Sequence, residues 1–96
     1  MRDIDFEWDE SKAASNLRKH KVSFRQATLA FYDPNMIDDY DGEHSEDEPG
    51  FKVIGTVQGK LLAVNFTERH NRIRIISARS ATRKEHDDYH RQDSQE

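Results

Sequence analysis

In the second half of the chain, apolar residues recur in three successive short runs. They span residues 51–57, 60–67 and 72–79. Runs of this length with a period of two are typical of strands, and the middle run is apolar on both faces, as in a central strand. Gln58-Gly59 suits a two-residue hairpin turn, and residues 68–71 form the next turn. The pattern predicts an antiparallel meander, with residues 36–40 as a weaker strand candidate.

The first half of the chain has the spacing of a short strand followed by helices. Residues 4–8 alternate between apolar and acidic side chains, which favours a strand with one apolar face. Asp9 then suits the N-cap of a helix over residues 10–20. The stripe that this helix is expected to bury consists of Ala13, Leu17 and His20.

Two further helices are predicted from their N-terminal caps. Ser23 and Gln26 have the spacing of a capping box, and the helix they begin should end near Tyr32, before Asp33-Pro34. Its inward residues are expected to be Phe24, Ala27, Thr28 and Phe31. The last helix is expected to be capped by Ser80 or Thr82, with Glu85 as the capping-box partner of Thr82. Only Ala81 and Tyr89 are suited to packing.

Composition limits the kind of protein that this chain can form. The chain has 96 residues, 33% of them hydrophobic, so we expect one domain with a thin core over residues 1–91 and a disordered tail at 92–96. Cysteine is absent, which excludes disulfides and thiolate metal sites, and the five histidines lack a convincing metal-ligand spacing. The sequence contains neither an apolar run of the ~20 residues that span a bilayer nor a signal peptide, so a cytoplasmic protein is expected.

Charge is distributed in blocks, although the formal net charge is −4. Residues 33–48 hold eight acidic and no basic residues, whereas residues 11–25 hold five basic and no acidic ones. Residues 52–84 hold eight basic residues and one acid, Glu68. If the two basic blocks meet in space they form a patch that suits a polyanion, although each block taken singly is more simply a solvated face.

Two groups of residues near the ends of the chain form a pattern that resembles a known family. The first group is Phe6-Glu7-Trp8-Asp9, Lys12, Asn16, Lys19-His20 and Val22-Ser23-Phe24, and the second is Arg74-Ile75-Ile76-Ser77-Ala78-Arg79, Ala81-Thr82, Glu85 and Tyr89. Together they are similar to the signatures of BrnT-type toxins and span nearly the whole chain. One departure is Lys21, where the family usually has a glycine that ends the helix.

The resemblance implies a fold and an activity. The expected fold is α+β and RelE-like, with N-terminal helices packed on an antiparallel sheet of three to four strands and a C-terminal helix. The expected activity is that of the toxin in a type II toxin–antitoxin pair, an endoribonuclease that inhibits translation. Its expected partner is a BrnA-like, DNA-binding antitoxin, through which alone the toxin would contact operator DNA.

Cleavage of RNA without metal or cofactor requires few groups. The substrate's 2′-hydroxyl attacks its own phosphate, while an acid and a base move protons and cations stabilise the phosphoryl charge. His20 is the natural acid or base, since free imidazole titrates near neutral pH; its alternative is a structural role at a helix C-terminus. Arg79 and Arg69 are the phosphate-stabilising candidates. They are expected at opposite ends of one strand, about 25 Å apart at ~3.3 Å per residue.

Each remaining candidate residue has a functional and a structural interpretation. The further catalytic candidates are Lys19, Glu68 and Tyr89, and the RNA-binding candidates are Lys12, Arg72, Arg74 and Arg83. Structurally, these are exposed cations, a turn residue and an anchor for the last helix, and Arg79 could instead form a salt bridge to Glu7 or Asp9.

An alternative function is a non-catalytic binding module that acts as a co-repressor with a DNA-binding partner. The thin core and the overall acidity favour this interpretation. The acidic residues from Asp38 to Glu48 are expected to contact a basic partner or to repel nucleic acid.

Overall fold

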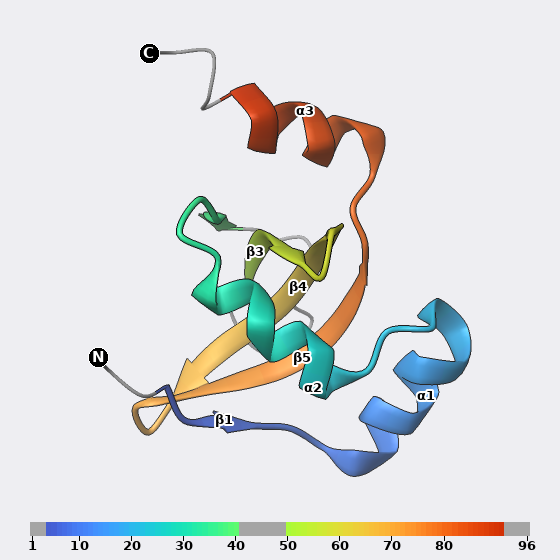
Figure 1. Cartoon of the computed structure of the whole chain (residues 1–96). Helices are drawn as coiled ribbons and strands as arrows, with labels where there is room; N and C mark the ends of the chain where they lie inside the picture. The colour runs from blue at the N-terminus through green and yellow to red at the C-terminus, as the bar shows by residue number, and fades with distance from the viewer. Residues whose placement is uncertain (1–3, 41–49, 92–96) are drawn as a thin grey trace.

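The computed structural model describes residues 4–40 and 50–91, and it contains helices on both faces of one sheet (Figure 1). In the described residues, the strands are β1 (Phe6–Glu7), β2 (Ile37–Tyr40), β3 (Phe51–Val57), β4 (Lys60–Arg69) and β5 (Arg72–Ser80). The helices are α1 (Glu10–His20), α2 (Phe24–Thr28), the 3₁₀ helix η1 (Leu29–Tyr32) and α3 (Arg83–Arg91). The predicted α+β class is confirmed.

The sheet is larger than predicted, and it is mixed. Its strand order is β1-β5-β4-β3-β2, and four of these strands form an antiparallel meander. β1 pairs with β5 in parallel, with Phe6 opposite Ile73 and Glu7 opposite Arg74. The prediction of a purely antiparallel sheet of three to four strands was therefore wrong. A parallel pair needs no local turn, so the sequence around β1 carries no signal for it.

The predicted helix starts are confirmed by their capping bonds. The Asp9 carboxylate accepts hydrogen bonds from the backbone N–H groups of Ser11 and Lys12. Ser23 and Gln26 form a capping box at α2, and Thr82 and Glu85 form another at α3. These signals were readable because a cap depends only on residues three positions apart.

The buried residue of α1 is not one of those predicted. Asn16 is buried, whereas His20 is exposed and the Leu17 side chain is 48% exposed. The Asn16 amide donates to the carbonyls of Val22 and Ala78, at 2.9 and 2.8 Å, and accepts from the Ala78 N–H at 3.1 Å. Ala13 of the predicted stripe does pack against the core, but this amide takes the place of Leu17 and His20, because α1 contacts β5 partly through polar groups.

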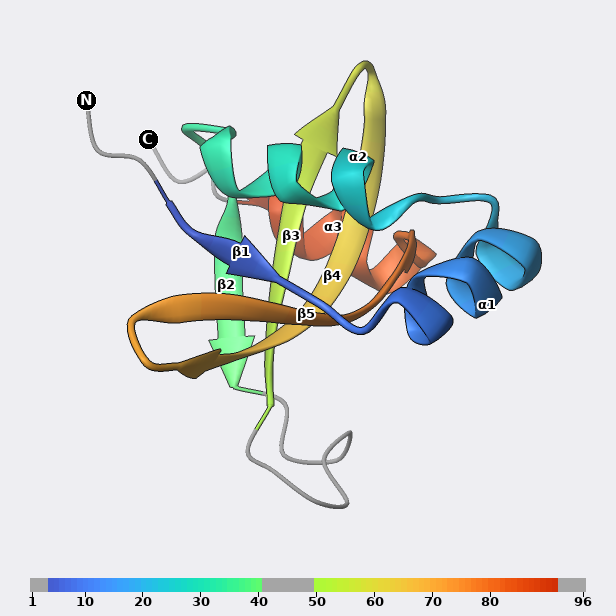
Figure 2. The same cartoon turned by 90° about the horizontal axis from the view of Figure 1, so that it is seen from below.

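The main core lies between the sheet and the α1, α2 and η1 layer. Figure 2 shows α2 crossing one face of the strands while α3 lies on the other face. Phe24, Val53, Val64 and Ile75 are the largest fully buried side chains of the described residues. Gly55 permits the close approach of β3 to η1, since a Cβ atom there would lie 2.5 Å from the Ala30 carbonyl oxygen.

A second, smaller apolar cluster lies beneath α3. It consists of Ile54, Leu61, Ala63 and Tyr89, with Ile37 and Ala81 at its edge. The expected packing of Ala81 and Tyr89 is confirmed. The predicted tail at residues 92–96 and the acidic residues 41–48 lie outside the described residues.

Within residues 4–40 and 50–91, four residues other than glycine adopt a positive φ, and all four lie at turns or helix ends. Gln58 (φ 52°) precedes Gly59 in the β3–β4 turn, and His70 (54°) and Asn71 (65°) form the β4–β5 turn. That turn is shorter than the predicted span of residues 68–71, because β4 extends through Arg69. Lys21 (62°) ends α1 in the left-handed conformation, which costs a lysine ~1 kcal/mol that glycine avoids.

Candidate functional site

A β-bulge determines which arginines of β5 share a face of the sheet. The pairing of β4 with β5 shifts register between Asn65 and Phe66, so Arg74 lies opposite Thr67 and Arg79 lies opposite Ala63. Without the extra residue, Arg74 and Arg79 would point to opposite faces, because five positions separate them. With it, both lie on the face of the sheet that α3 partly covers.

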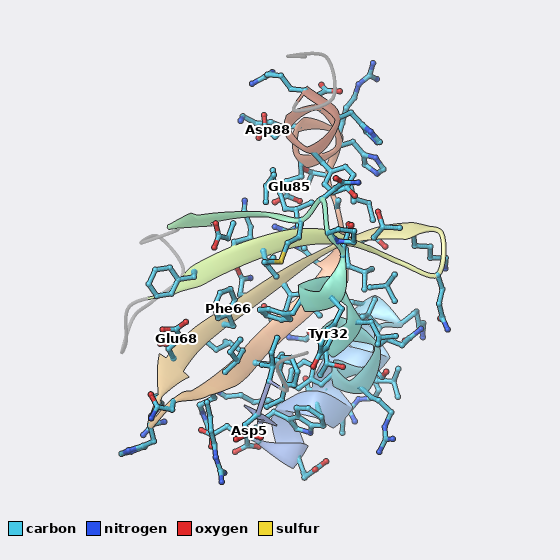
Figure 3. All side chains as sticks on the ribbon, turned by 60° about the vertical axis from the view of Figure 1, so that its left-hand side comes forward. Asp5, Tyr32, Phe66, Glu68, Glu85 and Asp88 are labelled. Atoms are coloured by element: carbon cyan, nitrogen blue, oxygen red, sulfur yellow. The ribbon has the colours of Figure 1, made fainter. Side chains whose placement is uncertain are left out.

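Arg79 is fastened to α3 by a carboxylate that it shares with a lysine. Its guanidinium donates to both oxygens of Glu85, at 2.7 and 3.0 Å. Lys52 on β3 donates to the second oxygen at 2.8 Å. Figure 3 shows Glu85 beneath α3, between the helix and the sheet. The predicted alternative of a bridge from Arg79 to Glu7 or Asp9 was wrong in its partner, because Asp9 caps α1 and Glu7 faces other arginines.

Glu85 is held in its charged form. Burial by itself raises the pKa of the Glu85 carboxyl, but hydrogen bonds from Arg79 and Lys52 outweigh it and hold that pKa well below its usual range. The Thr82 N–H adds a fourth hydrogen bond to the carboxylate. A side chain predicted only as a capping residue is therefore the centre of a buried ionic cluster.

Tyr89 anchors the other end of α3. Its hydroxyl donates to the Asp33 carboxylate at 2.6 Å and accepts from the Thr56 hydroxyl at 3.1 Å. Burial tends to raise the pKa of Asp33, but the bonds from Tyr89 and Thr56 lower it overall. Tyr89 is 7% exposed. Of its two predicted roles, catalytic residue and anchor of the last helix, this burial suits the anchor.

A cleft between α1 and β5 brings together basic residues that were predicted separately. It has a volume of about 190 Å³. Its lining consists of Lys12, Ser15, Asn16, Lys19, His20, Ile76 and Ser77. None of these residues is acidic, and α1 supplies all three titratable groups because Lys12 lies about two helical turns before the adjacent residues Lys19 and His20.

Asn65 on β4 lies beside Ser77, which lines the cleft. Its amide nitrogen donates to the Ser77 hydroxyl at 2.9 Å, and its side-chain oxygen is buried without a hydrogen-bond partner in the described structure. A buried acceptor without a donor costs roughly 1–3 kcal/mol.

The β4–β5 turn carries a separate group of charged residues. Glu68, Arg69 and Arg72 line a cleft of about 400 Å³ at that turn. Arg69 pairs with Arg72 in the ladder, whereas Arg79 lies opposite Ala63, which confirms that Arg69 and Arg79 are at opposite ends of β5. Glu7 lies 3.7 Å from Arg72 and 3.3 Å from Arg74.

Residues 4–40 and 50–91 contain no cluster of three or more metal-ligating side chains, and no helix there is long and apolar enough to cross a membrane. His86 and His90, whose rings stack 6.1 Å apart on α3, belong to no such cluster.

Comparison with protein families identifies the family of this chain. The family model described as a ribonuclease toxin, BrnT, of type II toxin–antitoxin systems matches residues 8–85. The chain belongs to the BrnT family. No curated protein matches the chain. As a member of a type II toxin family, the BrnT chain has a cognate antitoxin as its partner.

The BrnT fold separates the predicted site residues into three groups. Lys12, Lys19 and His20 lie together in the α1–β5 cleft. Arg79 and Tyr89 lie beneath α3, and Arg83 is exposed at the start of that helix. Glu68, Arg69, Arg72 and Arg74 lie on the far half of the β4–β5 hairpin.

Four polar residues of this region were not among the predicted site residues: Asn16, Lys52, Asn65 and Glu85. Asn16 and Glu85 belonged to the family pattern, and their positions could have marked them for a structural role. Lys52 and Asn65 carried no signal, because only the sheet register brings them beside β5 and α3.

Proposed function

We propose that this BrnT protein is a metal-independent endoribonuclease that binds the scissile nucleotide in the α1–β5 cleft. The observation that carries the proposal is the acid-free lining of that cleft, where Lys12, Lys19 and His20 meet Ser77. Such a lining attracts a phosphodiester and offers groups that transfer protons.

In the proposed reaction the 2′-oxygen forms a bond to phosphorus as the bond from phosphorus to the 5′-oxygen breaks. The products are a 2′,3′-cyclic phosphate and a 5′-hydroxyl. His20 removes the proton of the 2′-hydroxyl or gives a proton to the 5′-oxygen, and water completes the other transfer. Lys19 and Lys12 stabilise the charge on the phosphoryl group. The buried oxygen of Asn65, beside Ser77, suits a contact with a hydroxyl donor of the substrate.

Arg79 is the third cation that we assign to the phosphoryl group, after Lys12 and Lys19. It lies two residues beyond Ser77 on the same face, ~7 Å along the strand. Its bidentate bridge to Glu85 mimics the geometry in which a guanidinium binds phosphate, so the substrate would compete with Glu85 for the same donors.

The other candidates are given secondary roles in this proposal. Glu68, Arg69 and Arg72 lie too far along the hairpin to reach the same phosphate, and Glu7 compensates the charge of Arg74. Arg83 and the arginines of the hairpin would contact flanking RNA, and Tyr89 would hold α3 in place.

The resemblance to BrnT toxins supports the wider role as well. The protein would act in the cytoplasm as a RelE-like toxin that inhibits translation, and a BrnA-like, DNA-binding antitoxin would neutralise it. The alternative of a non-catalytic co-repressor rests on composition alone, and the match to a ribonuclease toxin family does not support it.

The test is cleavage of a labelled RNA by the purified chain with EDTA present. We expect products with 2′,3′-cyclic phosphate ends, and His20→Ala should lower the cleavage rate ~10²- to 10⁴-fold. His86→Ala, which removes an exposed histidine of α3, is the matched control and should cleave normally. Normal cleavage by His20→Ala would contradict the assignment of His20, and no cleavage by the wild-type chain would contradict the proposal as a whole.

A further inference from the structure

A second basic cleft lies on the other side of His20. It is formed where the end of α1 and the start of α2 approach the β3–β4 turn, and its volume is about 390 Å³. The polar side chains that line it are His20, Lys21, Gln26, Gln58, Lys60 and Ser80. Every titratable residue in this lining is basic, and the others donate or accept hydrogen bonds. This composition suits an anion with polar substituents.

His20 joins this cleft to the α1–β5 cleft, because it lines both. A chain of nucleotides with its scissile phosphate at His20 would therefore continue directly into the second cleft. The two clefts together present four lysines: Lys12, Lys19, Lys21 and Lys60. No acidic residue lines either cleft, so a run of phosphates along this path meets no like charge from its walls.

Backbone conformation provides an independent argument for function. Lys21 and Gln58 line this cleft, and both adopt the left-handed conformation, with φ of 62° and 52°. Glycine is the residue that this conformation favours at a helix end and in a two-residue hairpin turn. Strained residues of this kind cluster at binding sites, where the side chain contributes what glycine cannot. Here the contribution of Lys21 is an ammonium group at the cleft.

We propose that this cleft is a subsite for the nucleotide next to the scissile phosphate, with Lys21 and Lys60 binding its backbone phosphate. The inference rests on the proposed ribonuclease function and extends it to a substrate of several nucleotides. It implies that the protein prefers single-stranded RNA longer than a dinucleotide, since only a longer chain reaches both clefts.

The test measures binding of fully 2′-O-methylated oligouridines, which lack the attacking hydroxyl and stay intact. Fluorescence anisotropy compares a dinucleotide with an octanucleotide over a range of salt concentrations. Lys60→Ala should weaken octanucleotide binding about threefold to tenfold and reduce the slope of log K against log salt by ~0.7, the value for one phosphate contact on a single strand. The dinucleotide should bind unchanged. Lys84→Ala removes the same charge from the exposed surface of α3 and should leave both affinities unchanged.

Lys21→Gly separates a binding role from a structural one. Relief of the left-handed strain should raise the Tm by roughly 4–8 °C, while loss of the ammonium weakens octanucleotide binding. A lysine that only ends a helix would give the rise in Tm without the loss of binding, and that result would overturn the role of Lys21.

Other outcomes of the binding test overturn the subsite. They are normal octanucleotide affinity in Lys60→Ala, or an equal loss of dinucleotide affinity, which would place Lys60 at the scissile phosphate. The two proposals fail separately. Normal cleavage by His20→Ala contradicts the proposed function even if Lys60→Ala binds weakly, whereas an inactive His20→Ala with normal binding by Lys60→Ala contradicts only the subsite.

Discussion

The two basic regions of this molecule differ in how their cations are compensated. Arg72, Arg74 and Arg79, on the arginine-rich strand β5, each face a glutamate at 2.7–3.7 Å. The lysines and His20 along α1 line clefts without a carboxylate. The segment with the most arginines is therefore the one whose charge the fold uses internally, whereas the lysines and the histidine of α1 line open clefts. The number of arginines in a segment is thus a poor guide to the charge that a ligand meets.

Arg79 provides the most direct test of this contrast between the two basic regions. If it stabilises the phosphoryl group, Arg79→Ala should slow RNA cleavage ~10²- to 10³-fold, whereas Glu85→Gln should retain cleavage because it leaves the guanidinium in place. If Arg79 serves only to fasten α3, the two variants should lose cleavage and stability equally. Rates on one labelled RNA, together with urea unfolding of each variant, distinguish the two cases.

Asn16 holds the wall of the α1–β5 cleft against the sheet. Asn16→Ala should lower the free energy of unfolding by about 2–4 kcal/mol, since it leaves two carbonyls and one N–H of the backbone without their partner. Denaturant unfolding measures the loss. Ser15→Ala, at the neighbouring position of the same cleft, is the control, and a loss of the same size there would show that Asn16 has no special role.

Low pH should weaken the attachment of α3 to the sheet, because Glu85 becomes protonated. Because the pKa of Glu85 is lower in the folded chain than its ordinary value of about 4.5, its contribution to stability is complete above that value. It is lost as the pH falls below 4.5 toward the folded-state pKa. Unfolding free energies measured from pH 7 to pH 2 should therefore fall less steeply for Glu85→Gln than for the wild type. Parallel curves would contradict this account. The pKa of Asp33 is also lowered, so its protonation reduces the unfolding free energy at low pH in the wild type and in Glu85→Gln alike.

Arg74 should give the smallest effect, since Glu7 already compensates its charge. Arg74→Ala is expected to reduce stability by at most ~1 kcal/mol, the range for a partly exposed ion pair, and to leave the cleavage rate within about twofold. A loss of cleavage as large as that expected for Arg79→Ala would show that the far half of the hairpin belongs to the site, and it would remove the contrast between the two regions.

Much of the fold was predictable because it depends on neighbouring residues. The caps at Asp9, Ser23 and Thr82 and the turn at Gln58-Gly59 appear where their short spacings indicated them. Helical spacing placed Lys12, Lys19 and His20 on one helix, but the expectation that His20 would be buried was wrong, and only the fold shows that the three residues line one cleft. The parallel pairing that adds β1 to the sheet and the partner of Arg79 were not predictable in this way.

Residue order alone thus specifies the helix starts, the hairpin turns and the periodicity of the strands, since these arise from dihedral preferences and hydrogen bonds within a few positions. The partners of the charged groups arise differently. Glu7 and Arg74 are 67 positions apart, and Lys52 and Glu85 are 33 apart, so only the packed sheet brings them together. One extra residue at the bulge also sets the face on which Arg79 lies. Electrostatic compensation depends on distance in space, and for this chain the tertiary fold alone sets that distance.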